Sequence, residues 1–398
     1  MSTLAVVIGD MDLVRPLGLA GIRCVAAGPT GPETAWSRHS VDAISLPDLW
    51  DDPEAVTRRL IDYARTLDHR PVLVYQKDPA VLLISRDREE LGAWYRFVVP
   101  DHEVVEDLVD KERFQARAEA LGVPVPLGRS GVAGRDPLPD AGMTYPLVVK
   151  PVLRSRPQQT WQAVAGGSKA LTVSDSAELR GLWQRPELRD VRTMVQEYVP
   201  GDATTIVSYH AYVDADGTVV GQFTGRKIRT NPPEVGISTA VEITRDDRAA
   251  ETGRAALRAF GFTGVAKVDM KRTPGGDHVV VEINPRFNLW HHPGAVAGVN
   301  LPAAVYRHLT EGRTQPLPPA TAGVRWVQVW GDWSSSGQAG VPRTTWMKSV
   351  IDAQARRAFH LDDPGATAGA LAWAVLKRRG SQAHHDAGTS ESAATPRP

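Results

Sequence analysis

Four polar side chains around residue 280 have the types and spacing that suit metal and phosphate chemistry. Glu282, Asn284 and Arg286 alternate along an apolar run, and Asp269 lies on the apolar run before it. Successive side chains of a strand point to opposite faces, so Glu282, Asn284 and Arg286 project from the same face. A Pro-Gly-Gly-Asp stretch between the runs predicts a hairpin that brings Asp269 close to Glu282. Two carboxylates and an amide oxygen suit Mg²⁺, and an arginine beside them suits a phosphoryl or carboxylate group.

Basic residues upstream could complete a site for a phosphorylated ligand. Lys150 ends the apolar run 147–150, where a buried charge needs a partner such as a phosphate oxygen, unless it extends to water. Lys111 begins a charged stretch and by itself would be an ordinary surface lysine. Arg226 and Lys227 belong to a basic run that is either a solvated strand edge or an anion clamp. A hairpin with solvated charges remains the plainer interpretation of residues 269–286.

The order of these motifs is more specific than any one of them. From Lys111 to residue 309 the chain resembles the ATP-grasp superfamily of carboxylate ligases. The motifs that carry this resemblance are Lys111, Lys150, the segment 195–201, Arg226-Lys227, Asp269 and Glu282-x-Asn284-x-Arg286. The phrase Glu-Ile-Asn-Pro-Arg at 282–286, followed by a Gly-rich turn, looks most like the D-aspartate ligase and carbamoyl-phosphate-synthase-like branch of carboxylate–amine ligases.

The resemblance implies a role for each matched residue. ATP would bind through Lys111, Lys150, the strand segment Gln196, Glu197 and Val199, Asp202 at the ribose, and Lys169 in a phosphate-covering loop at 153–169. Which of Gln196 and Glu197 faces the adenine is left open. Asp269, Glu282 and Asn284 would hold Mg²⁺ or Mn²⁺, and Arg286, Arg226 and Lys227 would contact the transferred phosphate.

The family's chemistry implies an ADP-forming reaction that joins a carboxylate to an amine through an acyl phosphate. An amino acid or a peptide is the expected substrate. Two alternatives stay open: a non-amine acceptor or bicarbonate as the carboxylate, and an ATP-binding regulatory module without turnover. The adjacent His291 and His292 follow the metal run. They are either a structural turn or a base that accepts the amine proton.

Composition narrows the classes of partner. Lys plus Arg and Asp plus Glu number 46 each, so no overall basic field favours nucleic acid. No apolar stretch reaches the length of a membrane span, and no signal-peptide pattern begins the chain. A single cysteine, Cys24, excludes an internal disulfide and fits a reducing compartment. We therefore expect a cytoplasmic enzyme acting on small molecules, and leave a homodimer open.

Apolar periodicity predicts the fold class as α/β and α+β. Strand, helix and strand patterns at 4–8, 12–20 and 22–27 predict a doubly wound N-terminal domain of the pre-ATP-grasp type, followed by a two-lobed ATP-grasp domain. One long helix is expected at 103–121. The predicted boundaries are 1–105 for the first domain, 106–195 for the small lobe, 196–315 for the large lobe, 316–379 for an unassigned Trp-containing extension, and 380–398 for a disordered tail.

Overall fold

Three sheets organise the chain. The structure is a computed structural model. It describes residues 3–29, 33–152, 161, 164–166, 168, 170–233, 236–357, 360, 362–369 and 371–372. The predicted ligand Lys169 and the predicted tail 380–398 lie outside them. Within them, no helix has the length and apolar character needed to cross a bilayer.

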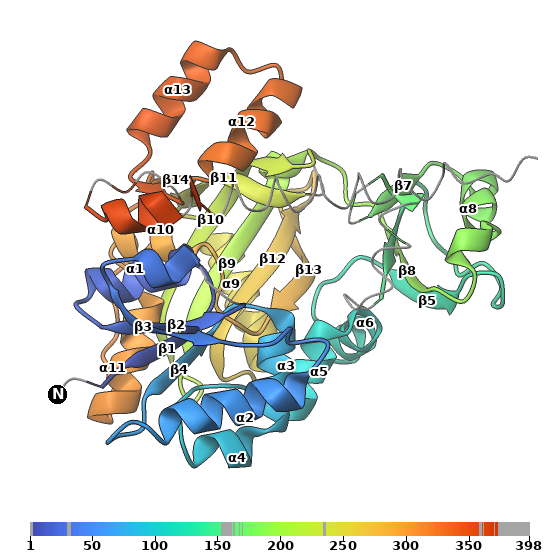
Figure 1. The fold of residues 1–398 in the computed structure, drawn as a ribbon. Helices are drawn as coiled ribbons and strands as arrows, with labels where there is room; N and C mark the ends of the chain where they lie inside the picture. Colours follow the sequence, from blue (N-terminus) through green and yellow to red (C-terminus); the bar gives the residue numbers. More distant parts are fainter. Residues whose placement is uncertain are drawn as a thin grey trace, which may run out of the picture.

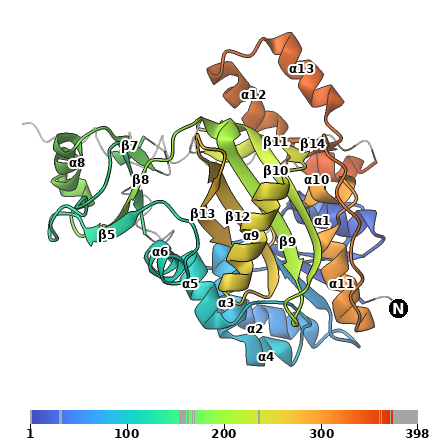
Figure 2. The ribbon, with the colours of Figure 1, turned by 180° about the vertical axis from the view of Figure 1, so that it is seen from behind.

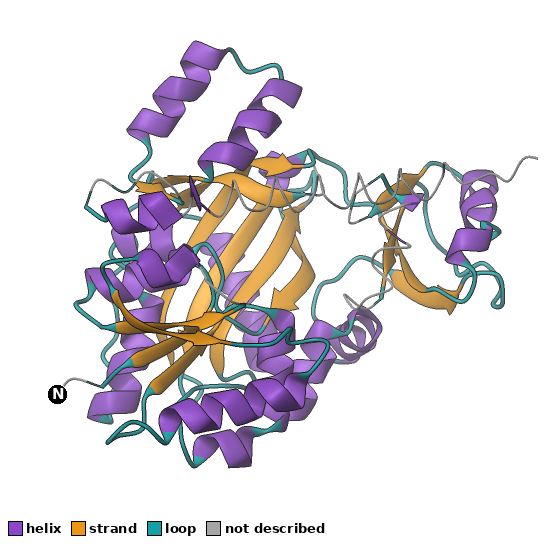
Figure 3. Cartoon of the chain, viewed as in Figure 1, coloured by secondary structure: helices purple, strands orange, loops and turns teal. Residues whose placement is uncertain are grey.

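The N-terminal domain is a small parallel sheet with helices on both sides (Figures 1 and 3). Its strand order is β3-β2-β1-β4, and every neighbouring pair is parallel. The strands are β1 (Ala5–Ile8), β2 (Cys24–Gly28), β3 (Ser40–Ser45) and β4 (Val72–Tyr75), and the helices are α1 (Met11–Leu19), α2 (Pro53–Ala64), α3 (Asp78–Arg86) and α4 (Arg88–Gly92). The predicted doubly wound domain is confirmed, and β3 is an additional strand that the apolar pattern did not reveal.

The predicted helix at 103–121 is wrong as a single element. The chain forms α5 (His102–Val109) and α6 (Lys111–Ala120), separated by Asp110 in an extended conformation. The Asp110 carboxylate accepts hydrogen bonds from the backbone N–H groups of Glu112 and Arg113 and so caps α6. A capping aspartate inside a periodic pattern therefore starts a second helix, with Lys111 in its first turn.

A second, antiparallel sheet stands apart from the rest of the molecule and carries one helix (Figures 1 and 2). Its strand order is β5-β8-β6-β7. Leu147, Val149 and Val195 face a small apolar core under α8. The elements are β5 (Gly128–Val132), β6 (Leu147–Pro151), β7 (Leu171–Val173), α8 (Ser176–Trp183) and β8 (Arg192–Glu197).

The third sheet has seven strands in the order β13-β12-β9-β10-β11-β14-β15. Helix α9 covers one face, where its apolar residues join a core with Val268 and Ile283. Its strands are β9 (Ile206–Val213), β10 (Val219–Asn231), β11 (Ile237–Thr244), β12 (Gly264–Arg272), β13 (His278–Asn284), β14 (Arg325–Val327) and β15 (Ala355–Arg356). The accompanying helices are α9 (Asp247–Ala259), α10 (His291–Val296) and α11 (Leu301–Glu311).

The extension that the sequence left unassigned contributes two parts. Helices α12 (Val329–Gln338) and α13 (Arg343–Asp352) project from the edge of the seven-stranded sheet as an arm (Figure 1). Trp346 is buried between them and donates to Asp332 at 3.0 Å, whereas Trp330 and Trp333 are about half exposed. Trp326, on β14, is buried and donates to Asp12 of α1 at 2.7 Å.

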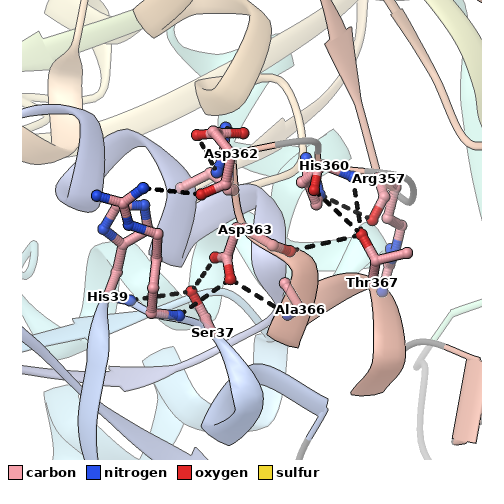
Figure 4. A network of polar contacts seen from close by, with 10 residues as sticks. Ser37, His39, Arg357, His360, Asp362, Asp363, Ala366 and Thr367 are labelled. Atoms are coloured by element: carbon pink, nitrogen blue, oxygen red, sulfur yellow. Dashed lines mark hydrogen bonds and ion pairs between the residues drawn. The ribbon is translucent and has the colours of Figure 1, made fainter.

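The C-terminal segment is bound to the N-terminal domain by a polar network (Figure 4). Arg15 of α1, almost fully buried, forms an ion pair with Asp362 at 2.9 Å. Asp363 is buried and accepts hydrogen bonds from the Ser37 hydroxyl at 2.6 Å and the Arg38 backbone N–H at 3.0 Å. The first and last described parts of the chain are therefore one packed unit.

Candidate active site

Strand alternation in the second sheet creates a face with Lys150 and Gln196 together. Val148 is opposite Gln196 in the register, so Lys150, two residues further, projects from the same face as Gln196. Lys150 Nζ donates to Gln196 Oε1 at 3.0 Å. The apolar residues between them point to the opposite face and fill the small core. This pattern explains how a lysine can end a buried strand without entering the core.

These two residues line a cavity that we call the first hollow. Lys111 lies in it at the start of α6 and donates to the Val152 carbonyl at 3.0 Å. Phe114 and Met194 form an apolar wall of the cavity, and residues of β13 form another wall. The defining residues are Lys111, Phe114, Lys150, Met194, Gln196, Glu282 and Asn284. The first hollow thus combines two ammonium groups with apolar surface, as an adenine nucleotide requires.

The neighbouring Glu197 does not line the first hollow. It is opposite Leu147 in the register, on the other side of the strand, and its carboxylate accepts the Thr144 N–H at 2.8 Å. Gln196 is buried and is held by Gln115, whose Oε1 accepts from it at 3.0 Å. Between these two candidates, the geometry brings Gln196 to the cavity. Val199 and Asp202 are also outside its lining, and the Asp202 carboxylate accepts from the Thr204 N–H and hydroxyl.

The β12–β13 hairpin has the predicted pairing. Asp269 is opposite Glu282, and Lys267 is opposite Asn284. All four side chains project from the face opposite to the α9 core, because Val268 and Ile283 occupy that core. Asn284 Nδ2 donates to Glu282 Oε1 at 3.1 Å. The hairpin therefore gathers two carboxylates and an amide oxygen on one surface.

The hairpin forms the floor of a second hollow, separate from the first. Both hollows include Glu282 and Asn284 in their linings, so these two residues stand where the cavities meet. Its defining residues are Gln76, Lys227, Ser238, Lys267, Asp269, Glu282, Asn284, Arg286, Asn288 and Trp290. A group bound across Glu282 and Asn284 would therefore contact ligands in both hollows.

Two cations of the second hollow, Lys267 and Arg286, are paired with carboxylates. Lys267 Nζ donates to Asp269 Oδ2 at 2.6 Å, and the two side chains are 12% and 7% exposed. Ser208 on β9 donates to the other Asp269 oxygen. Arg286 is paired with Asp78, at the start of α3, and also donates to Asn284 Oδ1 at 3.2 Å. The N-terminal domain thus supplies a carboxylate that holds Arg286.

Arg226 and Lys227 lie on opposite faces of β10. Gly225 is opposite Ser208 on β9, so Lys227, two residues further, shares the face of the second hollow and lines it. Trp290 packs against Gly225, where a Cβ would lie 2.4 Å from the indole. Arg226 instead projects to the other face and is paired with Glu242 at 2.6 Å. Of this basic pair, only Lys227 is brought to the hairpin.

His291 and His292 are inside the protein rather than in either cavity. Both are in α10 and buried, and burial lowers the pKa of each to about 3. His291 packs against the ring of Phe287. Neutral imidazoles without access to a cavity do not accept a proton from substrate, so the structural interpretation holds.

Three residues of the site went unnoticed in the sequence. Lys267 lies two positions before Asp269, and the period of a strand would have placed it on the same face. Gln76 and Asp78 come from the N-terminal domain, about 190 residues before the hairpin, and nothing in their local pattern marks them. Packing of the first domain on the large sheet brings them to Arg286.

The donor set fits a hard divalent cation. Asp269, Glu282 and Asn284 offer only oxygen ligands, which Mg²⁺ prefers. No group of three or more His, Cys, Asp or Glu side chains gathers to hold a metal in the described part of the chain, so a site here depends on the Asn284 oxygen. Lys267 and Arg286 are bonded to two of these oxygens, and a bound cation would have to share them.

The chain is similar to known proteins in sequence and in fold. No family model matches the chain. D-aspartate ligase of Enterococcus faecium (strain Aus0004) is 25% identical over 300 residues, which cover 72% of this chain and 70% of that protein. Among solved structures, an ADP complex of an N5-carboxyaminoimidazole ribonucleotide synthetase aligns with a TM-score of 0.60 and 17% identity, over 81% of this chain and 80% of that one.

An L-amino acid ligase from Bacillus licheniformis aligns with a TM-score of 0.59 and 15% identity, over 79% of this chain and 78% of that one. These alignments agree with the predicted fold class, an N-terminal parallel-sheet domain followed by a two-lobed domain. The chain is thus similar in sequence to a D-aspartate ligase, and it shares its fold with these two solved enzymes.

Proposed function

We propose that the chain joins the carboxylate of an amino acid or a peptide to an amine, with conversion of ATP to ADP and phosphate. The observation that carries this proposal is that the two hollows meet at Glu282 and Asn284. ATP in the first hollow would direct its γ-phosphate toward that junction, and the acid in the second hollow would meet it there. The relationship with D-aspartate ligase supports an acidic amino acid as the carboxylate substrate.

The nucleotide would be bound by side chains of the first hollow. Lys111 and Lys150 are positioned to bind phosphate oxygens, and Gln196 to hold the Lys150 ammonium group in place through its 3.0 Å hydrogen bond. Phe114 and Met194 provide apolar contact for the base. Asp269, Glu282 and Asn284 would hold Mg²⁺, which when bound neutralises charge on phosphate oxygens.

The second hollow would then bind and activate the acid. A carboxylate oxygen attacks the γ-phosphorus, the bond to the β-phosphate oxygen breaks, and ADP leaves with that electron pair. Lys227, Lys267 and Arg286 would bind the oxygens of the transferred phosphoryl group. The amine attacks the acyl carbon, loses a proton as the C–N bond forms, and expels inorganic phosphate.

The test is release of ADP and phosphate by the purified chain with ATP and Mg²⁺, across pooled amino acids, peptides and amines. We expect release that requires an acid and an amine together and that the Asp269→Ala, Glu282→Ala double variant lacks. Release with bicarbonate alone, or with an acid and a non-amine acceptor, would contradict the amine step. Tight ATP binding with no release from any pool would contradict turnover and favour a regulatory module.

Neighbouring residues on β10 offer a matched control. Lys227→Met should lower kcat/KM roughly 10- to 100-fold, because a charge-assisted hydrogen bond to phosphate is lost. Arg226→Met removes the same charge from the other face and should change kcat/KM less than about 2-fold. Equal effects of the two substitutions would contradict the assignment of Lys227 to the phosphoryl group.

A further inference from the structure

Gln76 is a polar residue of the second hollow that comes from the N-terminal domain. It directly follows β4 and lines the cavity together with Arg286 and Asn288. The β4 strand contacts the part of the fold that carries the large sheet, since Tyr75 packs edge-on against Phe287. Gln76 is therefore held by a rigid element and contributes to a cavity whose floor belongs to the large sheet.

Its amide group has a defined orientation. The backbone N–H of Asp10 donates to Gln76 Oε1 at 2.8 Å. A backbone N–H only donates, so the atom that accepts it must be the amide oxygen. Gly9 makes room for this contact, because a Cβ there would lie 2.7 Å from Oε1. The Nε2 group, which has no hydrogen-bond partner among the described residues, is the donor that Gln76 offers to a bound molecule.

Asn288 repeats this arrangement from the other side of the cavity. The Trp290 backbone N–H donates to Asn288 Oδ1 at 3.0 Å, which again fixes the oxygen and leaves the nitrogen as the donor. Its Nδ2 lies 3.5 Å from His291 Nε2, at the limit of a hydrogen bond. Two amides, one from each domain, thus present N–H groups in a cavity that also contains Arg286.

We infer that Gln76 is a specificity residue for the acid substrate, whose carboxylate or carbonyl oxygen accepts a hydrogen bond from Gln76 Nε2. This inference rests on the proposed function and extends it. N–H donors and guanidinium groups recognise anionic oxygens, whereas they offer nothing to an ammonium group. Gly9 and Asp10, in the loop between β1 and α1, hold the Gln76 amide and do not themselves bind the substrate. They are therefore positioning residues.

The test uses Gln76→Glu, which keeps the shape of the side chain. One glutamate oxygen can still accept the Asp10 N–H, but the other replaces a donor with an anionic acceptor. The KM for the acid substrate should rise about 10- to 100-fold, while the KM for ATP should stay within about 2-fold. Gln184→Glu, at the exposed end of α8, introduces the same charge as a control and should change neither constant.

A binding measurement separates this inference from the proposed function. Melting temperature is measured with Mg²⁺, a non-hydrolysable ATP analogue and millimolar aspartate or glutamate of either configuration. If the wild type releases ADP but Gln76→Glu leaves the KM for the acid unchanged, the inference is overturned and the ligase function stands. If the wild type releases no ADP, an acid that raises the melting temperature of the wild type but not that of Gln76→Glu supports the inference, although the proposed reaction does not occur. No stabilisation of the wild type by any acid overturns it.

Discussion

The two hollows differ in how their polar side chains are held. In the first, Lys111 and Lys150 each donate to a neutral oxygen, one of a backbone carbonyl and one of an amide. In the second, Lys267 and Arg286 each bind a carboxylate within the protein. In these two hydrogen bonds, replacement of the lysine leaves a neutral acceptor behind. Replacement in the second leaves a largely buried charge without its partner.

Because of this difference, substitutions in the two hollows should affect ligand affinity and folding stability to different degrees. Loss of a hydrogen bond from a charged donor to a neutral acceptor costs about 1.5–3 kcal/mol of stability, whereas removal of one member of a buried ion pair costs about 3–5 kcal/mol. Substitutions in the first hollow should therefore affect mainly the affinity for ATP. Substitutions in the second should affect the free energy of unfolding as well, and activity alone would not distinguish the two causes.

The largest expected effect is that of Lys267→Met. Asp269 would keep its hydrogen bond from Ser208 but lose its cation, so the free energy of unfolding should fall by about 3 kcal/mol. Denaturant unfolding measures this, and Arg272→Met at the exposed end of the same strand is the control, with an expected change below about 1 kcal/mol. Replacing Asp269 by Leu in addition should restore most of the loss. If Lys267→Met alone is as stable as the wild type, the proposed difference in stability between substitutions in the two hollows is wrong.

A smaller effect per residue is expected from acidification. Burial lowers the pKa of His291 and His292 to about 3 from 6.5, so the unfolded chain binds more protons between these values. Stability is therefore full above pH 6.5 and falls as the pH decreases toward about 3. Between pH 7 and pH 5 each histidine should cost about 2 kcal/mol. Denaturant unfolding at several pH values measures this loss. A free energy of unfolding that does not fall over this interval would contradict it.

The position of α10 sharpens the comparison further. Trp290 and Asn288 flank His291 and line the second hollow, whereas no histidine among the described residues lines the first. Burial lowers the pKa of His291 to about 3, so in the folded protein this side chain stays neutral at pH 5, and the affinity for the acid should not fall relative to the affinity for the ATP analogue. Titration of each ligand at pH 5 and pH 7.5 measures the two affinities. A selective loss of affinity for the acid at pH 5 would contradict this expectation.

The smallest effect on stability is expected for Lys150→Met. Its hydrogen bond to Gln196 has a neutral acceptor and contributes about 1.5 kcal/mol, so loss of this bond should lower the free energy of unfolding by about that amount. The affinity for ATP should nevertheless fall roughly 10- to 100-fold, because the substitution removes a charged donor to phosphate. Isothermal titration measures the affinity, with Lys348→Met on α13 as the control. Unchanged affinity would remove Lys150 from the nucleotide site.

Local periodicity was sufficient for the alternation along β13, where Glu282 and Asn284 share a face because a strand has a period of two. A register shift between Asp269 and Met270, which periodicity does not predict, sets Asp269 opposite Glu282. The parallel N-terminal sheet was equally accessible, since its buried strands are continuous apolar runs.

Other features depended on register and packing that the sequence does not display. Arg226 and Lys227 are equivalent as sequence, and only the pairing of β10 with β9 assigns one of them to the cavity. The same holds for Gln196 and Glu197 across β6 and β8. Gln76 and Asp78 reach the hairpin through contact between domains, which no local pattern encodes. Asp110 was overlooked because a capping carboxylate resembles any charged residue on a helix surface.

The contact between α1 and the C-terminal segment has a consequence for biosynthesis. Arg15 and its partner Asp362 are 347 residues apart in the chain. At the usual rates of translation, the ribosome needs on the order of tens of seconds to cover that distance. During that interval the nascent N-terminal domain exposes Arg15, Asp12 and Ser37 without the groups that later bind them. The domain that is made first therefore gains its last contacts only when the C-terminal segment is made. Ribosome stalling before Asp362 would leave the surface that binds this segment accessible to proteases and chaperones.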